Sequence, residues 1–385
     1  MKQRSDIAFP MSEYQRRLTK LRQGMQQREL DALLVTTPEN ITYLTGFESP
    51  GHYWFQALVV PLDAEPFTVS RLLEVSGVEA YSWIEHNLAY NDDDDQMAVL
   101  AARITDFGLA GATIGFEKNC WFFTATQQEQ LFGHLPGVRF VDASNSVEAC
   151  RLIKSELEIE TMRQAARTTE AGMRAGVDAV TEGATEDDVA AEISYAMIKA
   201  GSEWPSIVPF VASGERGAIG HATWRGRLLA NADSVFLEIA GCKRRYHAPM
   251  MRTCVVGLPE PELTAAFQVV QDAFQACLEA MRPGALPADI DATARSVVAA
   301  SSFGGTQTSR VGYSVGIAVP PDWGEGHILS IKPGERRPIQ ENMTFHLIPW
   351  VQIPGKGGVG CTETVRVTAT GSELLTDFPR ELFVG

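Results

Sequence analysis

Two titratable side chains, those of Glu238 and His221, have chemistry that could serve catalysis. Glu238 follows an apolar run at residues 235–237, which predicts a buried strand that ends at the glutamate. A carboxylate at the edge of a buried strand costs free energy unless it is paired, so Glu238 needs a cationic partner, a metal or a bound ligand. His221 lies in a glycine-rich loop seventeen residues earlier. An unperturbed imidazole, with a pKa of about 6.5, can take a proton from water and return it to a leaving nitrogen.

Both residues also have structural interpretations. Glu238 could form a buried salt bridge with one of the nearby arginines, which are Arg244, Arg245 and Arg252. A histidine considered alone is more often structural than catalytic. Arg252 is itself open to two interpretations, because it could pair with a neighbouring acid or bind a substrate carboxylate.

The composition is that of an ordinary soluble globular protein. The 385 residues leave room for about two domains, and 45% of them are apolar and 21% charged. The net charge of −15 argues against nucleic acid or an anionic membrane surface as a partner. The six cysteines are scattered without a CxxC pair, and no apolar run suits a signal peptide or a membrane span. We therefore expect a cytoplasmic protein that binds neither nucleic acid nor a membrane; the small-molecule substrate that we also expect follows only from the family resemblance described below.

Hydrophobic periodicity predicts a small α/β domain over about the first 150 residues. Helical spacing at 12–28, with Ser12 as the cap, precedes a buried strand at 31–36, and strand-like and helical segments then alternate. Such alternation is typical of α/β domains. A capping box formed by Ser155 and Glu158 then starts a long amphipathic helix, and we place the domain boundary just before it.

The second part of the chain contains further helices and strands. Helices are expected at 185–200, 263–281 and 289–300, and strands at 207–212, 235–239, 253–257, 343–348 and 364–368. Gly241 is expected to turn the chain between the strand that ends at Glu238 and an extended stretch through Tyr246. This order predicts an α+β fold class, with helices on one face of a curved antiparallel sheet.

Four parts of the sequence together carry a resemblance. They are residues 154–159 before the long helix, His221, the stretch 238–252, and residues 312–316, which read GYSVG. In order and spacing they resemble the pita-bread family, which includes methionine aminopeptidase, prolidase and creatinase. The resemblance implies a creatinase/prolidase-like N-terminal domain over residues 1–153 and a pita-bread catalytic domain over residues 154–385. It also places His221 at the histidine that shuttles the proton in creatinase.

The positions that bind metal in that family depart from its pattern. The peptidases hold two metals with two Asp, one His and two Glu. The matching positions here are Glu238, Pro249, Tyr313, Ile348 and Thr362. Hard divalent cations need several oxygen or imidazole ligands that converge on one point. Proline and isoleucine offer no side-chain donor atom, so we expect no metal and no other cofactor.

Four phrases, at residues 238–242, 245–249, 320–325 and 343–346, are most similar to ectoine hydrolases, which are metal-independent members that open a cyclic amidine. The resemblance implies hydrolysis of a C–N bond in ectoine or a related compound. Glu238 and a second carboxylate, Glu363, are candidates to hold the protonated amidine. The alternatives are a creatinase-like amidinohydrolase, an Xaa-Pro dipeptidase-like metallopeptidase and a non-catalytic binding protein of the same fold.

Other residues are candidates for substrate binding. Tyr313 and His346 are expected as hydrogen-bonding groups of the pocket, and His247 is either a third such group or a satisfied residue behind it. Trp54 and Phe55, taken alone, are typical of a core. In creatinase-like homodimers this N-terminal region reaches the partner's active site, where an aromatic face can stack on an amidinium. The resemblance therefore implies a homodimer and makes both aromatic residues candidates.

Overall fold

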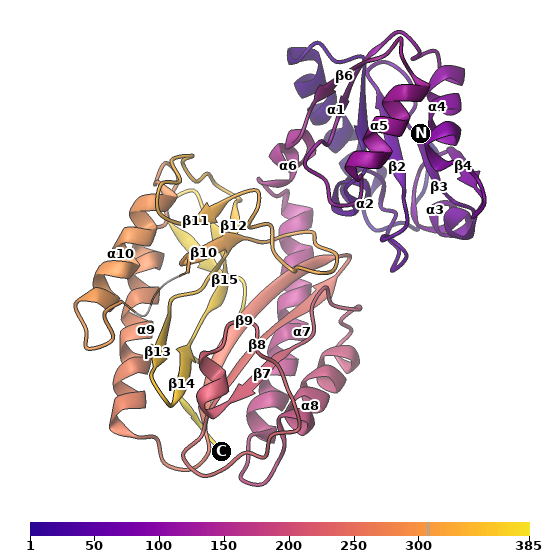
Figure 1. The fold of residues 1–385 in the computed structure, drawn as a ribbon. Coiled ribbons are helices and arrows are strands. Elements are labelled where there is room, and N and C mark those ends of the chain that lie inside the picture. Colours follow the sequence, from indigo (N-terminus) through magenta and orange to yellow (C-terminus); the bar gives the residue numbers. More distant parts are fainter. Residues whose placement is uncertain (306, 308) are drawn as a thin grey trace. The chain divides into compact units, whose positions relative to one another are not determined.

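The computed structural model describes residues 1–305, 307 and 309–385, which form two compact units (Figure 1). One unit comprises Met1–Arg151 and the other Leu152–Gly385, whereas the sequence places the boundary between residues 153 and 154. Both units combine helices with mixed or antiparallel sheets. The predicted fold class is therefore confirmed.

The N-terminal unit is built on a six-stranded sheet with the order β4-β3-β2-β1-β5-β6. The sheet is mixed, because β1 pairs antiparallel with β2 and parallel with β5. Its core joins apolar residues of the central strands, such as Leu34 and Val59, to Leu100 and Leu131 of two helices. The elements are α1 (Met11–Gln27), β1 (Ala32–Val35), α2 (Pro38–Thr45), β2 (Ala57–Pro61), β3 (Phe67–Arg71), η1 (Leu72–Glu74), α3 (Val75–Tyr81), β4 (His86–Tyr90), α4 (Gln96–Asp106), β5 (Thr113–Phe116), α5 (Ala125–His134), β6 (Arg139–Asp142) and α6 (Ser146–Arg151).

The C-terminal unit contains two larger sheets and a hairpin. Their strand orders are β17-β9-β8-β7, β11-β10-β12-β15-β16 and β13-β14. The elements are α7 (Glu156–Ala179), α8 (Glu186–Lys199), β7 (Phe210–Ser213), η2 (Gly214–Ala218), β8 (Ser234–Lys243), β9 (Tyr246–Val255), α9 (Pro261–Ala280), α10 (Pro287–Ala299), β10 (Gly312–Ser314), β11 (Ser330–Ile331), β12 (Thr344–Leu347), β13 (Trp350–Ile353), β14 (Gly357–Gly360), β15 (Glu363–Val367), β16 (Ser372–Leu374) and β17 (Phe383–Val384).

Each of the two larger sheets packs against its own pair of helices. Residues of α7 and α8, including Met173 and Ile193, share one apolar core with β8 and β9. Residues of α9 and α10 share another core with β11, β12 and β15, and Figure 1 shows the two helix pairs on their separate sheets. An isolated bridge between Met251 and Thr362 links β9 to the second sheet. The faces of the sheets that do not meet the helices are therefore free to form a site.

The helix starts follow the sequence in one case and depart from it in another. The Ser155 hydroxyl accepts a hydrogen bond from the Glu158 backbone at 3.3 Å, and the Glu158 carboxylate accepts one from the Ser155 backbone at 2.9 Å. The predicted capping box is thus confirmed. The predicted cap at Ser12 is wrong, because α1 begins at Met11 after Pro10 and has no side-chain cap. No helix among the described residues is long and apolar enough to cross a membrane.

The predicted turn at Gly241 is also wrong. β8 does not end at Glu238 but continues to Lys243, and the chain turns at Arg244 and Arg245, whose φ angles are 49° and 64°. Gly241 serves a different purpose. A Cβ atom at this position would lie 2.0 Å from Thr168 Oγ1 on α7, so only glycine lets the helix pack this closely on the strand.

Candidate active site

The alternation of side chains along β8 sets the direction of Glu238. Leu237 and Ile239 belong to the core shared with α7 and α8. Because successive residues of a strand point to opposite faces, Glu238 points away from those helices. Phe210 on β7 lies directly opposite Glu238 in the antiparallel register, so both side chains emerge on this same face.

Tyr313 and His346 occupy the corresponding face of the second sheet. On β12, Phe345 and Leu347 belong to the core shared with α9 and α10, so His346 between them points to the other face. Tyr313 on β10 is the antiparallel partner of His346 and shares that face. The structure therefore brings Glu238 together with Tyr313 and His346, which lie more than seventy residues later in the sequence.

A chain of hydrogen bonds fixes the Tyr313 and His346 side chains. Tyr313 Oη lies 2.9 Å from His346 Nδ1 and accepts a hydrogen bond of 2.7 Å from Trp323 Nε1. His346 Nε2 lies 2.6 Å from Thr362 Oγ1. Burial, followed by the charges of Arg310 and Arg252, lowers the pKa of His346 to about 3. The ring is therefore neutral, and its two nitrogens are already engaged.

Glu238 differs from these residues because it has no hydrogen-bond partner within the part of the chain that the structure describes. The nearest ring nitrogen, His346 Nδ1, lies 3.9 Å from Glu238 Oε1, which is too long for a hydrogen bond. The Glu238 side chain is 13% exposed. Burial, followed by the negative charge of Asp322, raises the pKa of Glu238 to about 8. The carboxyl group is thus held in an environment that disfavours its charge until a cation arrives.

The structural alternative for Glu238, a salt bridge to a nearby arginine, does not form. Arg252 pairs with Glu363 and also donates to the carbonyls of Met251 and Thr362. Its two remaining donors reach the carbonyls of Pro379 and Phe378. Both partners of the ion pair are buried, and Glu363 also accepts a hydrogen bond from the Thr376 hydroxyl. Arg252 and Glu363 are therefore occupied by each other, and the structure does not bring them to Glu238.

His247 is also engaged in the interior. Its side chain is fully buried, its Nδ1 lies 3.0 Å from the Arg245 carbonyl, and its Nε2 accepts a hydrogen bond of 3.2 Å from the Ser206 backbone. Burial, followed by the charge of Arg245, lowers the pKa of His247 well below its usual value. This geometry matches the interpretation of His247 as a satisfied group. Arg245 donates to the carbonyls of Trp204 and Ala318 rather than to Glu238.

His221 reaches the site through an aromatic contact. Its backbone has a φ of 62°, and its exposed ring stacks on Phe210 with centroids 5.5 Å apart and planes 29° apart. Phe210 also contacts Trp323, at 5.2 Å between centroids. Phe210 is the cross-strand partner of Glu238, so one ring beside Glu238 contacts both His221 and the Trp323 side chain that donates to Tyr313.

Sequence reasoning missed three of these residues as members of the site. Phe210 lies inside a predicted strand, and Trp323 and Asp322 lie inside a phrase that carried the family resemblance. The predicted strand and the phrase were thus recognised. A single sequence does not show, however, that Phe210 pairs with Glu238 or that Trp323 donates to Tyr313.

Trp54 and Phe55 belong to the N-terminal unit. Phe55 is 5% exposed and lies in the core, with its ring centroid 6.0 Å from that of Phe123. Trp54 is 37% exposed, and the Arg71 guanidinium lies 4.3 Å above its ring. Of the two aromatic candidates, only Trp54 presents a ring face that a ligand can reach.

The metal-binding pattern of the family does not fit the residues of this site. Pro249 and Ile348 have no donor atom, and Tyr313 and Thr362 are both hydrogen-bonded to His346. Among the residues that the structure describes, no three His, Cys, Asp or Glu side chains are grouped in a way that could hold a metal ion. Glu238 alone supplies too few ligands for two cations.

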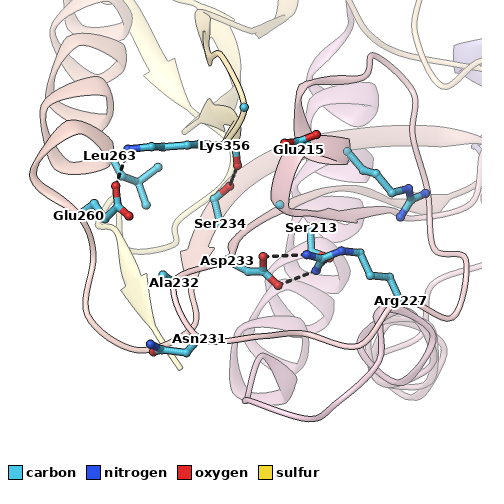
Figure 2. Close-up of a pocket in the computed structure, with 13 residues that line it drawn as sticks. Ser213, Glu215, Arg227, Asn231, Ala232, Asp233, Ser234, Glu260, Leu263 and Lys356 are labelled. Carbon is cyan, nitrogen blue, oxygen red and sulfur yellow. Dashed lines mark hydrogen bonds and ion pairs between the residues drawn. The ribbon is translucent and has the colours of Figure 1, made fainter.

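A cavity of about 510 Å³ lies elsewhere in the C-terminal unit, at the start of β8 (Figure 2). Two of its cations are already paired, Arg227 with Asp233 and Lys356 with Glu260. None of the catalytic candidates lines it. Its lining residues are Ser213, Gly214, Glu215, Arg216, Arg227, Asn231, Ala232, Asp233, Ser234, Glu260, Leu263, Gly355 and Lys356.

Residues 160–369 match metallopeptidase family M24, and residues 17–153 match the creatinase/prolidase N-terminal domain. The chain belongs to family M24 and has its pita-bread fold.

Three relatives illustrate the range of the family. An ectoine hydrolase from Halomonas elongata is 34% identical, over 98% of this chain and 98% of the relative. An X-Pro aminopeptidase from Thermotoga maritima has a similar structure, with a TM-score of 0.85 and 23% identity over 96% of this chain and 99% of that one. A prolidase from Pyrococcus horikoshii gives a TM-score of 0.83 and 24% identity over 95% and 99%. The last two likenesses show the fold alone, and the relationships together support a hydrolase.

Proposed function

We propose that this protein is a metal-independent hydrolase that opens a small cyclic amidine, ectoine or a related compound. The observation that carries the proposal is the Glu238 carboxyl group, which is largely buried and has no hydrogen-bond partner among the described residues. Burying such a group costs free energy unless a ligand supplies the missing hydrogen bonds. The ectoine hydrolase relative supports the choice of substrate.

The chemistry of an amidine matches this carboxyl group. A protonated cyclic amidine is a planar cation with one N–H donor on each of two nitrogens. These donors point away from each other, so a carboxylate can accept one of them in a charge-assisted hydrogen bond. The positive charge also makes the amidine carbon electrophilic without a Lewis acid. When the cation binds, its charge lowers the pKa of Glu238 from about 8, so the carboxyl group ionises in the complex.

His221 is the proposed general base and acid. It removes a proton from water, and the water oxygen forms a bond to the amidinium carbon to give a tetrahedral intermediate. The C–N bond then breaks as His221 returns the proton to the departing nitrogen. Phe210 holds the His221 ring by stacking, and Trp323 and Tyr313 line the adjacent wall.

Metal independence is part of the same proposal. Pro249 and Ile348 stand where the peptidases of the family have ligands, and neither offers a donor atom. A dication next to Glu238 would also repel an amidinium. An Xaa-Pro dipeptidase would need the metals that these residues do not fit, whereas a creatinase-like substrate would place a guanidinium on Glu238 in the same way.

Incubation of the metal-stripped, full-length protein with three substrates tests the proposal. The substrates are ectoine, creatine and an Xaa-Pro dipeptide, and the products are identified by mass spectrometry. We expect ring opening of ectoine, at a rate that Mn²⁺, Co²⁺ and Zn²⁺ do not increase. Metal-dependent cleavage of the dipeptide would establish a peptidase, and turnover of creatine alone would establish an amidinohydrolase. Binding without turnover would identify a non-catalytic relative.

A further inference from the structure

Arg310 is a half-buried arginine beside the site that has no carboxylate partner within the described part of the chain. Its guanidinium lies over the Tyr313 ring, 4.5 Å from the centroid. Its Nη1 donates one hydrogen bond, of 3.2 Å, to the Ser330 hydroxyl. A guanidinium carries five N–H donors in a fixed fork, so the described residues leave most of the hydrogen-bonding capacity of Arg310 unused.

The other buried or half-buried arginines of this unit are engaged differently. Arg245 donates to backbone carbonyls and to the Ser206 hydroxyl. The remaining ones each form an ion pair with an acid: Arg163, Arg216, Arg227, Arg252, Arg295 and Arg366. The chain has 48 acidic residues against 33 Lys and Arg, so a lack of acids does not explain why Arg310 stays unpaired.

Arg310 is electrostatically part of the site. Tyr313, which Arg310 covers, lies 2.9 Å from His346, and His346 in turn lies 3.9 Å from Glu238. The charge of Arg310 contributes to the lowered pKa of His346. Arg310 and Glu238 form no ion pair with each other. The Tyr313–His346 pair thus links an unpaired guanidinium to an unpaired carboxyl group.

We propose that Arg310 binds the carboxylate of a substrate whose amidinium is held by Glu238. This role deepens the proposed function and rests on it. The two groups together select a zwitterion, with a planar cation and a carboxylate on one small molecule. Ectoine meets this description, because its cyclic amidine ring carries a carboxylate. Arg252, for which the sequence left this role open, is committed to Glu363.

Assays of several variants on two substrates test the proposal. A variant that merely misfolds loses activity on both substrates, whereas loss of a carboxylate contact affects only one. The full-length wild-type protein, Arg310→Met and Arg310→Lys are assayed on ectoine and on its carboxamide, which keeps the amidine but loses the carboxylate. Arg282→Met, an exposed arginine of the same unit, is the matched control. We expect Arg310→Met to lower kcat/KM for ectoine by about 10- to 100-fold, mainly through KM, and to change the carboxamide by less than about threefold. Arg310→Lys should recover part of the loss, because it keeps the charge without the fork.

Each outcome either supports or overturns the proposed role of Arg310. Equal losses on ectoine and on the carboxamide would mean that Arg310 only supports Tyr313 and would overturn the proposal. Wild-type kinetics of Arg310→Met on ectoine would overturn it as well. In both cases the wild-type protein remains active, so the proposed function survives. A wild-type protein that neither binds nor hydrolyses either compound would instead refute the proposed function, and the role of Arg310 with it.

Discussion

Replacing Glu238 by glutamine should separate activity from stability. Glu238→Gln keeps the shape of the side chain but removes its charge. It thereby removes a charge-assisted hydrogen bond to the amidinium, of about 1.5–3 kcal/mol, and the attraction between the two opposite charges. Their loss should lower kcat/KM on ectoine by about 10²- to 10⁴-fold. The fold should survive, because no described residue donates a hydrogen bond to this carboxyl group.

The same substitution should stabilise the protein at alkaline pH. The pKa of Glu238 rises from 4.5 to about 8 on folding, so between these values the unfolded chain ionises while the folded chain keeps its proton. Wild-type stability therefore falls as pH rises through this window. At about 1.4 kcal/mol per pKa unit, the upper limit is about 5 kcal/mol. Because water reaches the 13%-exposed side chain, we expect a gain of about 1–3 kcal/mol for Glu238→Gln at pH 9 and almost none at pH 4.

Denaturant unfolding at the two pH values, together with steady-state kinetics, measures both effects. Glu341→Gln, an exposed glutamate of the same unit, is the matched control and should change neither quantity. Wild-type kinetics of Glu238→Gln on ectoine would refute the assignment of this residue. A variant that is less stable than the wild type at pH 9 would show that Glu238 is paired in the folded protein.

Three further predictions concern other residues. His221→Ala should abolish turnover with little change in melting temperature, and wild-type kcat should fall on the acid side, where the base in the complex is protonated. A rate that is flat from pH 5 to 8 would contradict the role of His221 as base. Arg252→Met should instead destabilise the protein by about 3–5 kcal/mol in denaturant unfolding, because it leaves Glu363 buried and unpaired. We also propose a homodimer in which Trp54 contacts the substrate in the partner's pocket. Trp54→Ala should then raise KM by about 3- to 30-fold with little change in stability, and a fully active monomer in light scattering would contradict this.

Local signals in the sequence predicted much of the fold. The capping box at Ser155 and Glu158 and the helices of the second part follow from patterns within a few residues, and these elements form close to where they were expected. Gly241 shows the limit of such signals. Its glycine suggested a turn, but the reason for the glycine is the approach of α7, which is a tertiary contact with a residue more than seventy positions away.

The candidate site was likewise predictable only in part, because tertiary contacts are not visible in local sequence signals. Glu238, Tyr313 and His346 were identified from their positions, and the structure groups them. The pairing of Arg252 with Glu363, 111 residues later, depends on how β9 meets β15 and could not be read from the sequence. Nor could the lack of a carboxylate partner for Arg310 among the described residues, because it depends on which distant segments pack beside this side chain.

Proton release on ligand binding tests the central claim, that Glu238 binds a substrate cation directly, without a metal. Ectoine is titrated calorimetrically into metal-stripped His221→Ala at pH 6.5, in two buffers of different ionisation enthalpy. Glu238 is almost fully protonated in the free protein at this pH and ionises in the complex, so we expect about one proton to be released per ligand bound, and none in the double variant with Glu238→Gln. Binding without proton release, or binding that appears only after metal is restored, would contradict the claim.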